Sequence, residues 1–261
     1  MRPGRTRRLP LMLAGAAIAT LLAWPLASWA VEVPDSERMH WVAGDLPPYA
    51  WSDSAGPSGL AYELVRVMGE RMGRKVTVDF YPWARAVRIA QQGGSVGLFP
   101  LARTPERESD YRWLLPLGKV RQAFFGGPET DVEHIESLRA QRIGVLRGSF
   151  TGRALADKGF QSVVAAVDYE ELLRMLDRHV IDAIYASDEM FNFTLRKRGG
   201  RAAAVRQGLS LGAVEIYMAT ATTCNEAEAQ RWLQAYRDVV ADGTLARLER
   251  KYLSGAAAER R

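Results

Sequence analysis

The alternation of two hydrophobic periods restricts the folds open to this chain more than any other feature of its sequence. Apolar residues recur every third or fourth position over 60–72, which predicts a helix that ends at Gly73. Alternate residues are apolar over 76–80, as in a strand. A second helix, opened by a proline and closed by two glycines, is predicted over 82–92, and a second strand over 96–99.

The same order returns in the second part of the chain. A strand is predicted over 142–146, and Asp168 with Glu171 has the spacing of a capping box at the start of a helix. Another strand is predicted over 181–185, and a later helix over 225–243. The inward face of that helix is predicted to carry Trp232, Leu233, Tyr236 and Val240. Strands that alternate with helices of this length predict an α/β fold of mostly parallel sheets flanked by helices.

The first 30 residues have the three parts of a secretory signal. Four arginines without an acid precede an apolar run over 11–23, and Ser28-Trp29-Ala30 supplies the small residues of a cleavage site. We therefore expect export to the periplasm with cleavage after about Ala30; an uncleaved membrane anchor is the alternative.

Charge and cysteine content narrow the function classes. Without the first 30 residues the chain keeps 31 Lys and Arg against 30 Asp and Glu, and the two signs alternate, so no nucleic-acid partner is expected. The single cysteine, Cys224, cannot form an internal disulfide. Only the tail after Leu253 has the composition of a disordered segment.

Four stretches together resemble the extracellular solute-binding proteins of family 3, the polar amino-acid receptors of ABC importers. They are Gly44-Asp45-Leu46-Pro47-Pro48-Tyr49-Ala50-Trp51, Thr104-Pro105-Glu106-Arg107, Ile143-Gly144-Val145-Leu146-Arg147-Gly148-Ser149, and Ala241-Asp242-Gly243-Thr244 continuing to Lys251-Tyr252. The resemblance implies the type 2 periplasmic-binding-protein fold, with a ligand cleft between two lobes and two hinge crossings. Lobe 1 would comprise 38–122 and 215–261, lobe 2 the insertion 123–214, and 123–125 and 214–217 would be the crossings. It also implies a monomer that docks on an ABC permease of the inner membrane.

Arg107 is the strongest candidate for a ligand-binding residue. The resemblance implies that the arginine closing Thr-x-x-Arg takes the ligand's carboxylate, and a guanidinium suits that role because it donates two parallel charge-assisted hydrogen bonds. The alternative is a surface arginine behind the helix start Thr104-Pro105. Ser149, Phe150 and Thr151 follow a strand and a glycine, so they would offer backbone N–H groups and hydroxyls to an anion; an ordinary helix cap is the alternative.

Aromatic residues and one further arginine complete the candidates on the lobe 1 side. Tyr49 and Trp51 lie in a proline-rich stretch where aromatic rings have less reason to be buried, so they would line the cleft. Trp83 would either line the cleft or belong to the core. Arg85 is a further cleft candidate, with a solvated helix charge as its alternative.

Two departures from the resemblance affect the ligand. In the amino-acid receptors an aspartate after the Ile-Asp-Ala strand neutralises the ligand's amino group, whereas the matching position here is Ser187, with Asp188 one residue later. A serine-rich stretch before the arginine is replaced by Phe99-Pro100-Leu101-Ala102. The one-residue shift to Asp188 could restore the pairing with the amino group or destroy it. The loss of the serine-rich stretch makes a standard α-amino acid a less secure ligand.

The sequence predicts a binding protein without catalytic residues, metal or cofactor. His40, His134 and His179 lie singly, and the serine of Gly93-Gly94-Ser95-Val96-Gly97 follows a predicted helix rather than a strand, which excludes a hydrolase elbow. Two alternatives stay open. One is a periplasmic enzyme of the same fold, similar to the cyclohexadienyl dehydratases, with Glu63, Asp188 or Glu215 as acid or base; the other is a ligand-sensing module.

Overall fold

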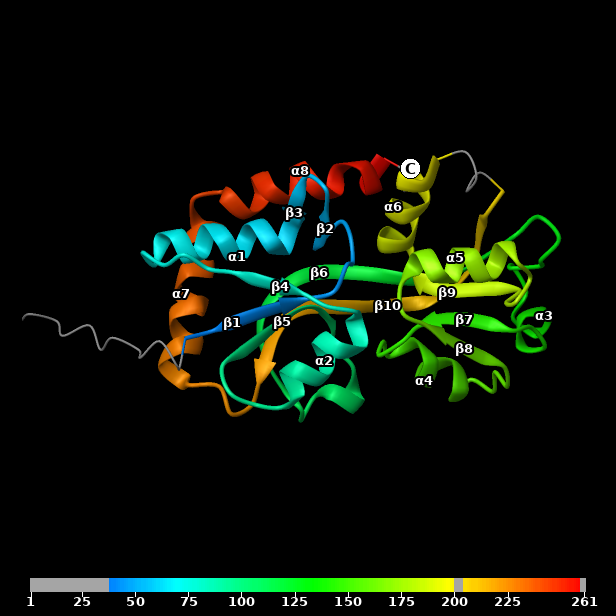
Figure 1. Cartoon of the computed structure of the whole chain (residues 1–261), viewed down its shortest axis with the longest axis horizontal. Coiled ribbons are helices and arrows are strands. Elements are labelled where there is room, and N and C mark those ends of the chain that lie inside the picture. Colours follow the sequence, from blue (N-terminus) through cyan, green and yellow to red (C-terminus); the bar gives the residue numbers. More distant parts are fainter. Residues whose placement is uncertain (1–37, 200–203, 259–261) are drawn as a thin grey trace, which may run out of the picture. The chain divides into compact units, whose positions relative to one another are not determined.

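The computed structural model describes residues 38–199 and 204–258. The expected signal segment, residues 1–30, lies outside these ranges. The main feature of the described chain is one mixed sheet of eight strands in the order β4-β1-β5-β10-β6-β9-β7-β8, with helices on both faces (Figure 1). A short hairpin of β2 (Trp51–Asp53) and β3 (Gly56–Ser58) stands apart from it.

The first half of the sheet consists of three parallel strands, β1 (His40–Ala43), β4 (Val78–Phe80) and β5 (Val96–Ala102). The helices of this half are α1 (Leu60–Arg71), α2 (Trp83–Gln91) and α7 (Glu226–Ala241), and α8 (Thr244–Ala258) packs on α1 and α7. Trp41 of β1 is fully buried and packs edge-on against Trp232 of α7, with 4.9 Å between ring centroids. These contacts hold α7, from the end of the chain, to the first strand.

The second half repeats this arrangement with β7 (Ile143–Leu146), β8 (Val163–Ala166) and β9 (Ala183–Ser187), which are parallel to one another. Its helices are α3 (Ile135–Arg139), α4 (Thr151–Ala156), α5 (Tyr169–Asp177) and α6 (Asp188–Arg198). Three aromatic rings form a group on this side. The ring centroid of Phe124 lies 5.6 Å from that of Phe160 and 4.7 Å from that of Tyr185.

Two long antiparallel strands, β6 (Tyr111–Gly126) and β10 (Arg206–Ala221), join the halves. In the first half β5 pairs with β10 from Ile216 onward, and in the second half β9 pairs with β6 from Gln122 onward. Between these points only 119–121 of β6 and 213–215 of β10 remain, a ribbon of two strands. The segment 123–125, expected as a crossing, therefore already belongs to the second half, whereas 214–217 begins in the ribbon.

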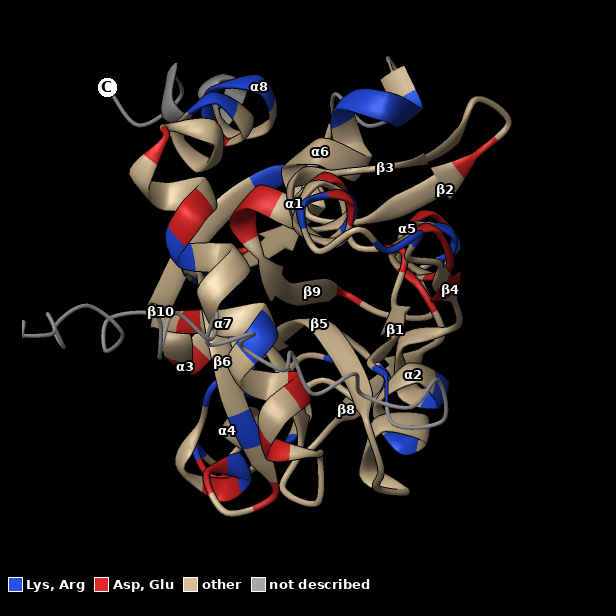
Figure 2. Cartoon of the chain, turned by 90° about the vertical axis from the view of Figure 1, so that its left-hand side faces the viewer, with Lys and Arg blue, Asp and Glu red and all other residues tan. Residues whose placement is uncertain are grey.

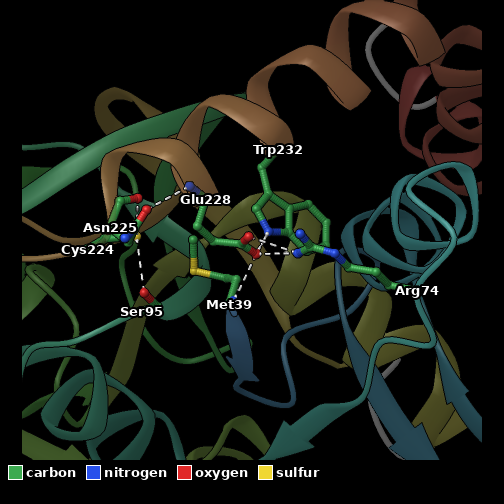
Figure 3. A network of polar contacts seen from close by, with 7 residues as sticks. All are labelled: Met39, Arg74, Ser95, Cys224, Asn225, Glu228 and Trp232. Carbon is green, nitrogen blue, oxygen red and sulfur yellow. Dashed lines mark hydrogen bonds and ion pairs between the residues drawn. The ribbon is translucent and has the colours of Figure 1, made fainter. Parts of the chain in front are cut away.

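A buried carboxylate connects three segments of the first half (Figure 3). Glu228, with a fully buried side chain, accepts hydrogen bonds from the backbone N–H of Met39 at 2.9 Å and from Nε1 of Trp232 at 2.9 Å. Arg74 donates from Nη1 to the same carboxylate at 2.6 Å. The network fixes the start of β1 and the loop after α1 against α7. The hydrogen bonds to the Glu228 carboxylate compensate for the cost of burying its charge.

Opposite charges are interspersed over α1, α7 and α8 (Figure 2). Two ion pairs hold α1 to the end of the chain, Arg71–Asp242 at 2.5 Å and Lys251–Glu63 at 2.7 Å. No helix of the described residues is long and apolar enough to be a membrane span.

Two expectations at the end of the chain are wrong. Helix α8 runs to Ala258, although the tail after Leu253 was expected to be disordered, because alanines have the highest helix propensity and can extend an existing helix. On α7 the buried position is Val239, and Val240 is 47% exposed, because the packed face turns by one residue over the length of the helix.

Candidate functional site

A cavity of about 50 Å³ lies where the two halves of the sheet meet. The first half contributes Trp83, Pro100 and Arg107, and the second half contributes Ser149, Phe150, Thr151, Tyr185 and Ser187. Val120, Gln122, Val214 and Ile216 of the two long strands also line it. Among the described residues that line the cavity, Arg107 is the one with a charged side chain.

Arg107 is positioned by a short 3-10 helix, Pro105–Arg107, that follows β5. Its Nη2 donates to the carbonyl of Gly148 at 2.9 Å, so this arginine of the first half bonds to the second half. Within the described residues no carboxylate lies within ion-pair distance of its guanidinium. Partial burial lowers the pKa of the Arg107 guanidinium, but an arginine keeps its proton in proteins. The cavity therefore contains a positive charge without an anion.

The turn at Gly148 brings the two halves into contact. Its φ is +81°, and a Cβ at this position would lie 2.7 Å from the Cα of Ala84 in α2, too close for any side chain. Ser149 Oγ donates to the carbonyl of Leu146 at 2.6 Å and lies 2.5 Å from Thr151 Oγ1. Both hydroxyls thus line the cavity while they also bond to their own loop. Helix α4, which follows, has only 6 residues.

Ser187 and Asp188 lie at the end of β9 but face different surroundings. Ser187 is buried, lines the cavity, and its Oγ has no hydrogen-bond partner among the described residues. Asp188 is outside the lining; its Oδ2 accepts from Nε of Arg121 at 2.9 Å and its Oδ1 from the N–H of Glu189 at 2.8 Å. The structure therefore places the serine, rather than the aspartate, at the cavity.

The aromatic candidates are divided between the cavity and its surroundings. Trp83 is 4% exposed and lines the cavity, so it belongs both to the core and to the site. Tyr49 is 1% exposed, and its hydroxyl donates to Oε2 of Glu189 at 2.7 Å. The expectation that its loop leaves it unburied is wrong, because the loop folds under α1, where the Tyr49 carbonyl accepts from the N–H of Ala61.

Trp51 and Arg85 do not line this cavity. Trp51 packs on Phe193 of α6 at 5.1 Å between ring centroids and borders a second cavity of about 380 Å³. That second cavity shares Leu46, Trp83, Leu146 and Tyr169 with the first and is also lined by Asp45, Asp168 and Glu170. Arg85 is exposed, stacks over the ring of Tyr81 at 4.7 Å, and lines neither of these cavities.

The structure adds Gln122 and Tyr185 to the cavity, and neither is among the residues expected there. Gln122 is 5% exposed, and its side-chain amide has no hydrogen bond to the described residues. A polar residue next to the apolar run Ala123-Phe124-Phe125 is the signal that could have identified it. Burial raises the pKa of Tyr185 to about 12, so its hydroxyl stays protonated.

The carboxylates considered as catalytic groups lie outside the cavity. Glu63 accepts hydrogen bonds from Lys251 and Tyr252 of α8, and Glu215 is exposed and accepts from the hydroxyl of Tyr217 at 3.3 Å. Asp188 is paired with Arg121.

A comparison with protein-family models identifies the family of this chain. The model of the bacterial extracellular solute-binding proteins, family 3, matches residues 40–255, which is most of the chain. The chain belongs to this family. None of the curated proteins matches it.

Solved structures support the fold of this solute-binding protein. A histidine kinase sensor domain with similarity to periplasmic binding proteins superposes with a TM-score of 0.75 at 22% identity, over 84% of this chain and 98% of that one. An ancestral arginine-binding protein bound to arginine gives 0.73 at 18%, over 83% and 99%. A periplasmic binding protein of an arginine transport system from Legionella pneumophila gives 0.71 at 17%, over 82% and 99%. The family 3 protein therefore has the two-lobed α/β fold of the periplasmic binding proteins, as the resemblance implied.

Proposed function

We propose that this protein is a periplasmic receptor that encloses a small carboxylate-bearing molecule between its two lobes and presents the closed form to an ABC permease. The observation that carries the proposal is the guanidinium of Arg107, which faces a cavity lined from both halves and has no carboxylate partner among the described residues. A carboxylate would complete two charge-assisted hydrogen bonds there.

The contacts between the halves support closure around the guest. Besides the bond from Arg107 to Gly148, Lys197 of α6 pairs with Asp53 of β2 at 3.1 Å, and Tyr49 bonds to Glu189. A ligand that touches both halves favours the closed state by its differential affinity, and one held by a single half would not. We assign lobe 1 to 38–122 with 215–261 and lobe 2 to 123–214, which puts one boundary inside the two-stranded ribbon on β10 and the other just after it on β6.

A thermal-shift screen of residues 31–261 against carboxylates and amines tests the proposal. A ligand at a hundred times its Kd should add about 2.7 kcal/mol of stability, which raises the Tm by roughly 5–10 °C for a chain of this size. The Arg107→Ala variant should lose this shift while the Arg85→Ala variant, altered outside the cavity, keeps it. Full binding by Arg107→Ala would contradict the assignment.

A sensory role is the second candidate, since the histidine kinase sensor domain superposes as well as the transport receptors do. Both roles require the same capture step. A radiolabelled-uptake assay in cells with and without the gene distinguishes them, because loss of uptake is expected only for a transport receptor.

A further inference from the structure

We infer that the position next to the ligand's carboxylate is built for an uncharged substituent, so the guest is a carboxylic acid whose α-carbon carries hydrogen, hydroxyl or oxo rather than ammonium. The inference rests on the proposed function, because it takes the carboxylate of the guest to lie on Arg107. It concerns only the groups around the α-carbon.

The first support is the buried hydroxyl of Ser187. It is 4% exposed, lines the cavity, and its Oγ has no hydrogen-bond partner among the described residues. A buried hydroxyl without a partner is disfavoured, so it indicates a polar group that a guest supplies. The hydroxyl both donates and accepts, and it is neutral.

The second support is Gln122 on β6. It lies directly opposite Ser187 of the neighbouring strand β9. Gln122 is 5% exposed, lines the same cavity, and makes no side-chain hydrogen bond to the described residues. An amide can donate to a hydroxyl or oxo oxygen and can accept from a hydroxyl. Ser187 and Gln122 together form a neutral polar pair on the floor of the cavity.

The third support is the lack of an available carboxylate. No acidic side chain lines the cavity among the residues that the structure describes. The two nearest acids in sequence are already bonded: Asp188 to Arg121 and to a backbone N–H, and Glu189 to the hydroxyl of Tyr49. The acids Asp45, Asp168 and Glu170 line the second cavity. An ammonium beside Ser187 would therefore be buried in the same cavity as Arg107 without an acidic side chain among the described lining residues, which is unfavourable.

Matched series of ligands that differ only at the α-carbon test this inference. One series is L-alanine, L-lactate, pyruvate and propanoate; a second is L-leucine with its 2-hydroxy, 2-oxo and unsubstituted analogues; a third is the corresponding L-phenylalanine set. Kd values are measured by isothermal titration calorimetry on residues 31–261. Within the series that binds, the members without an α-ammonium group should bind at least about tenfold more tightly than the amino acid. An unpaired buried charge can cause a difference of about a hundredfold in Kd.

The outcomes separate the two claims. An amino acid that binds as tightly as its 2-hydroxy or 2-oxo analogue would overturn the inference and leave the proposed function standing. Failure of every carboxylate to bind would overturn both.

Substitutions at Ser187 give an independent readout. Ser187→Asp places a carboxylate at the cavity and should reverse the preference, strengthening the amino acid by about tenfold or more and weakening the 2-hydroxy acid. Ser187→Asn is the matched control of nearly equal size without charge, and it should not strengthen the amino acid. If both substitutions changed the amino acid's affinity equally, the inference would be wrong. Should Ser187→Asp fail to fold, the wild-type comparison alone still decides.

Discussion

At the scale of single residues, the chemistry of the cavity depends on which charged groups already have partners. Asp188 is bonded to Arg121 and Glu189 to Tyr49, while Arg107 bonds only to neutral carbonyl oxygens. This distribution leaves one positive charge for a guest. The sequence predicted Arg107 and Ser187 at the cleft, but whether Asp188 would turn toward the cleft could not be read from it, because the rotation of β9 and the side chain of Arg121 decide that.

The geometry of the Arg107 guanidinium gives a prediction on ligand affinity. Arg107→Lys keeps the charge but replaces a planar fork by a single ammonium, so one hydrogen bond to the carboxylate is lost. A hydrogen bond to a charged group contributes about 1.5–3 kcal/mol, and we expect Kd to rise by about tenfold to a hundredfold in calorimetric titrations. An unchanged Kd would show that the carboxylate is not held by the fork.

The buried network around Glu228 gives a prediction on stability. Arg74→Met removes the cation and leaves the carboxylate buried, which should lower the free energy of unfolding by about 3–5 kcal/mol in denaturant titrations. The control is Arg66 of α1, which forms an exposed ion pair with Glu70. Arg66→Met should lower the free energy of unfolding by less than about 1 kcal/mol. Equal losses would contradict the importance of burial.

The same network predicts how stability depends on pH. Burial raises the pKa of Glu228, but the hydrogen bonds from Arg74, Met39 and Trp232 outweigh it, so the folded-state pKa lies below the ordinary 4.5. A depressed carboxyl pKa stabilises the fold above the unfolded value and this stabilisation is lost as pH falls through the folded value. The loss of stability below about pH 4.5 should be smaller in Glu228→Gln than in the wild type, measured as Tm against pH. Parallel curves would contradict this.

At the scale of elements, local signals were predicted well and long-range contacts were not. Asp168 Oδ1 accepts from the N–H of Glu171 at 2.6 Å and Asn225 Oδ1 from that of Glu228 at 3.1 Å, which confirms both helix starts. Their causes are contained within four residues of sequence. The burial of Tyr49 was missed because it requires the start of α1 above it and Glu189 of α6 beside it, more than a hundred residues away.

The contact between the loop after β7 and helix α2 gives a prediction at this scale. Gly148 and Gly94 both have positive φ, +81° and +75°, so alanine should strain the backbone at either site by about 1–2 kcal/mol. Only at Gly148 would the added Cβ meet Ala84, at 2.7 Å, whereas at Gly94 nothing lies within 4 Å. Gly148→Ala should therefore also weaken ligand binding by tenfold or more, and Gly94→Ala should not. Equal affinities of the two variants would indicate that closure does not need this approach.

At the scale of the whole molecule, two half-sheets with parallel strands are joined, in the part of the sheet that the structure describes, by the paired strands β6 and β10. Within the described residues, 119–121 and 213–215 pair with each other and with no third strand, although the carbonyl of Glu215 accepts from the N–H of Arg103 at 2.9 Å. The sequence predicted the alternation that builds each half, and the resemblance supplied the crossings. On β6 the ribbon occupies 119–121, four residues earlier than the expected crossing 123–125. This position depends on the register between strands, which the sequence does not reveal.

The central claim is that a carboxylate held by Arg107 draws the two lobes together. Spin labels at the exposed positions Lys75 and Lys158, one on each lobe, in a Cys224→Ser background would report the distance between lobes by double electron–electron resonance. We predict that the carboxylate selected by the thermal screen shortens and narrows the distance distribution, and that Arg107→Ala abolishes the change. A distribution that saturating ligand leaves unaltered would contradict the account.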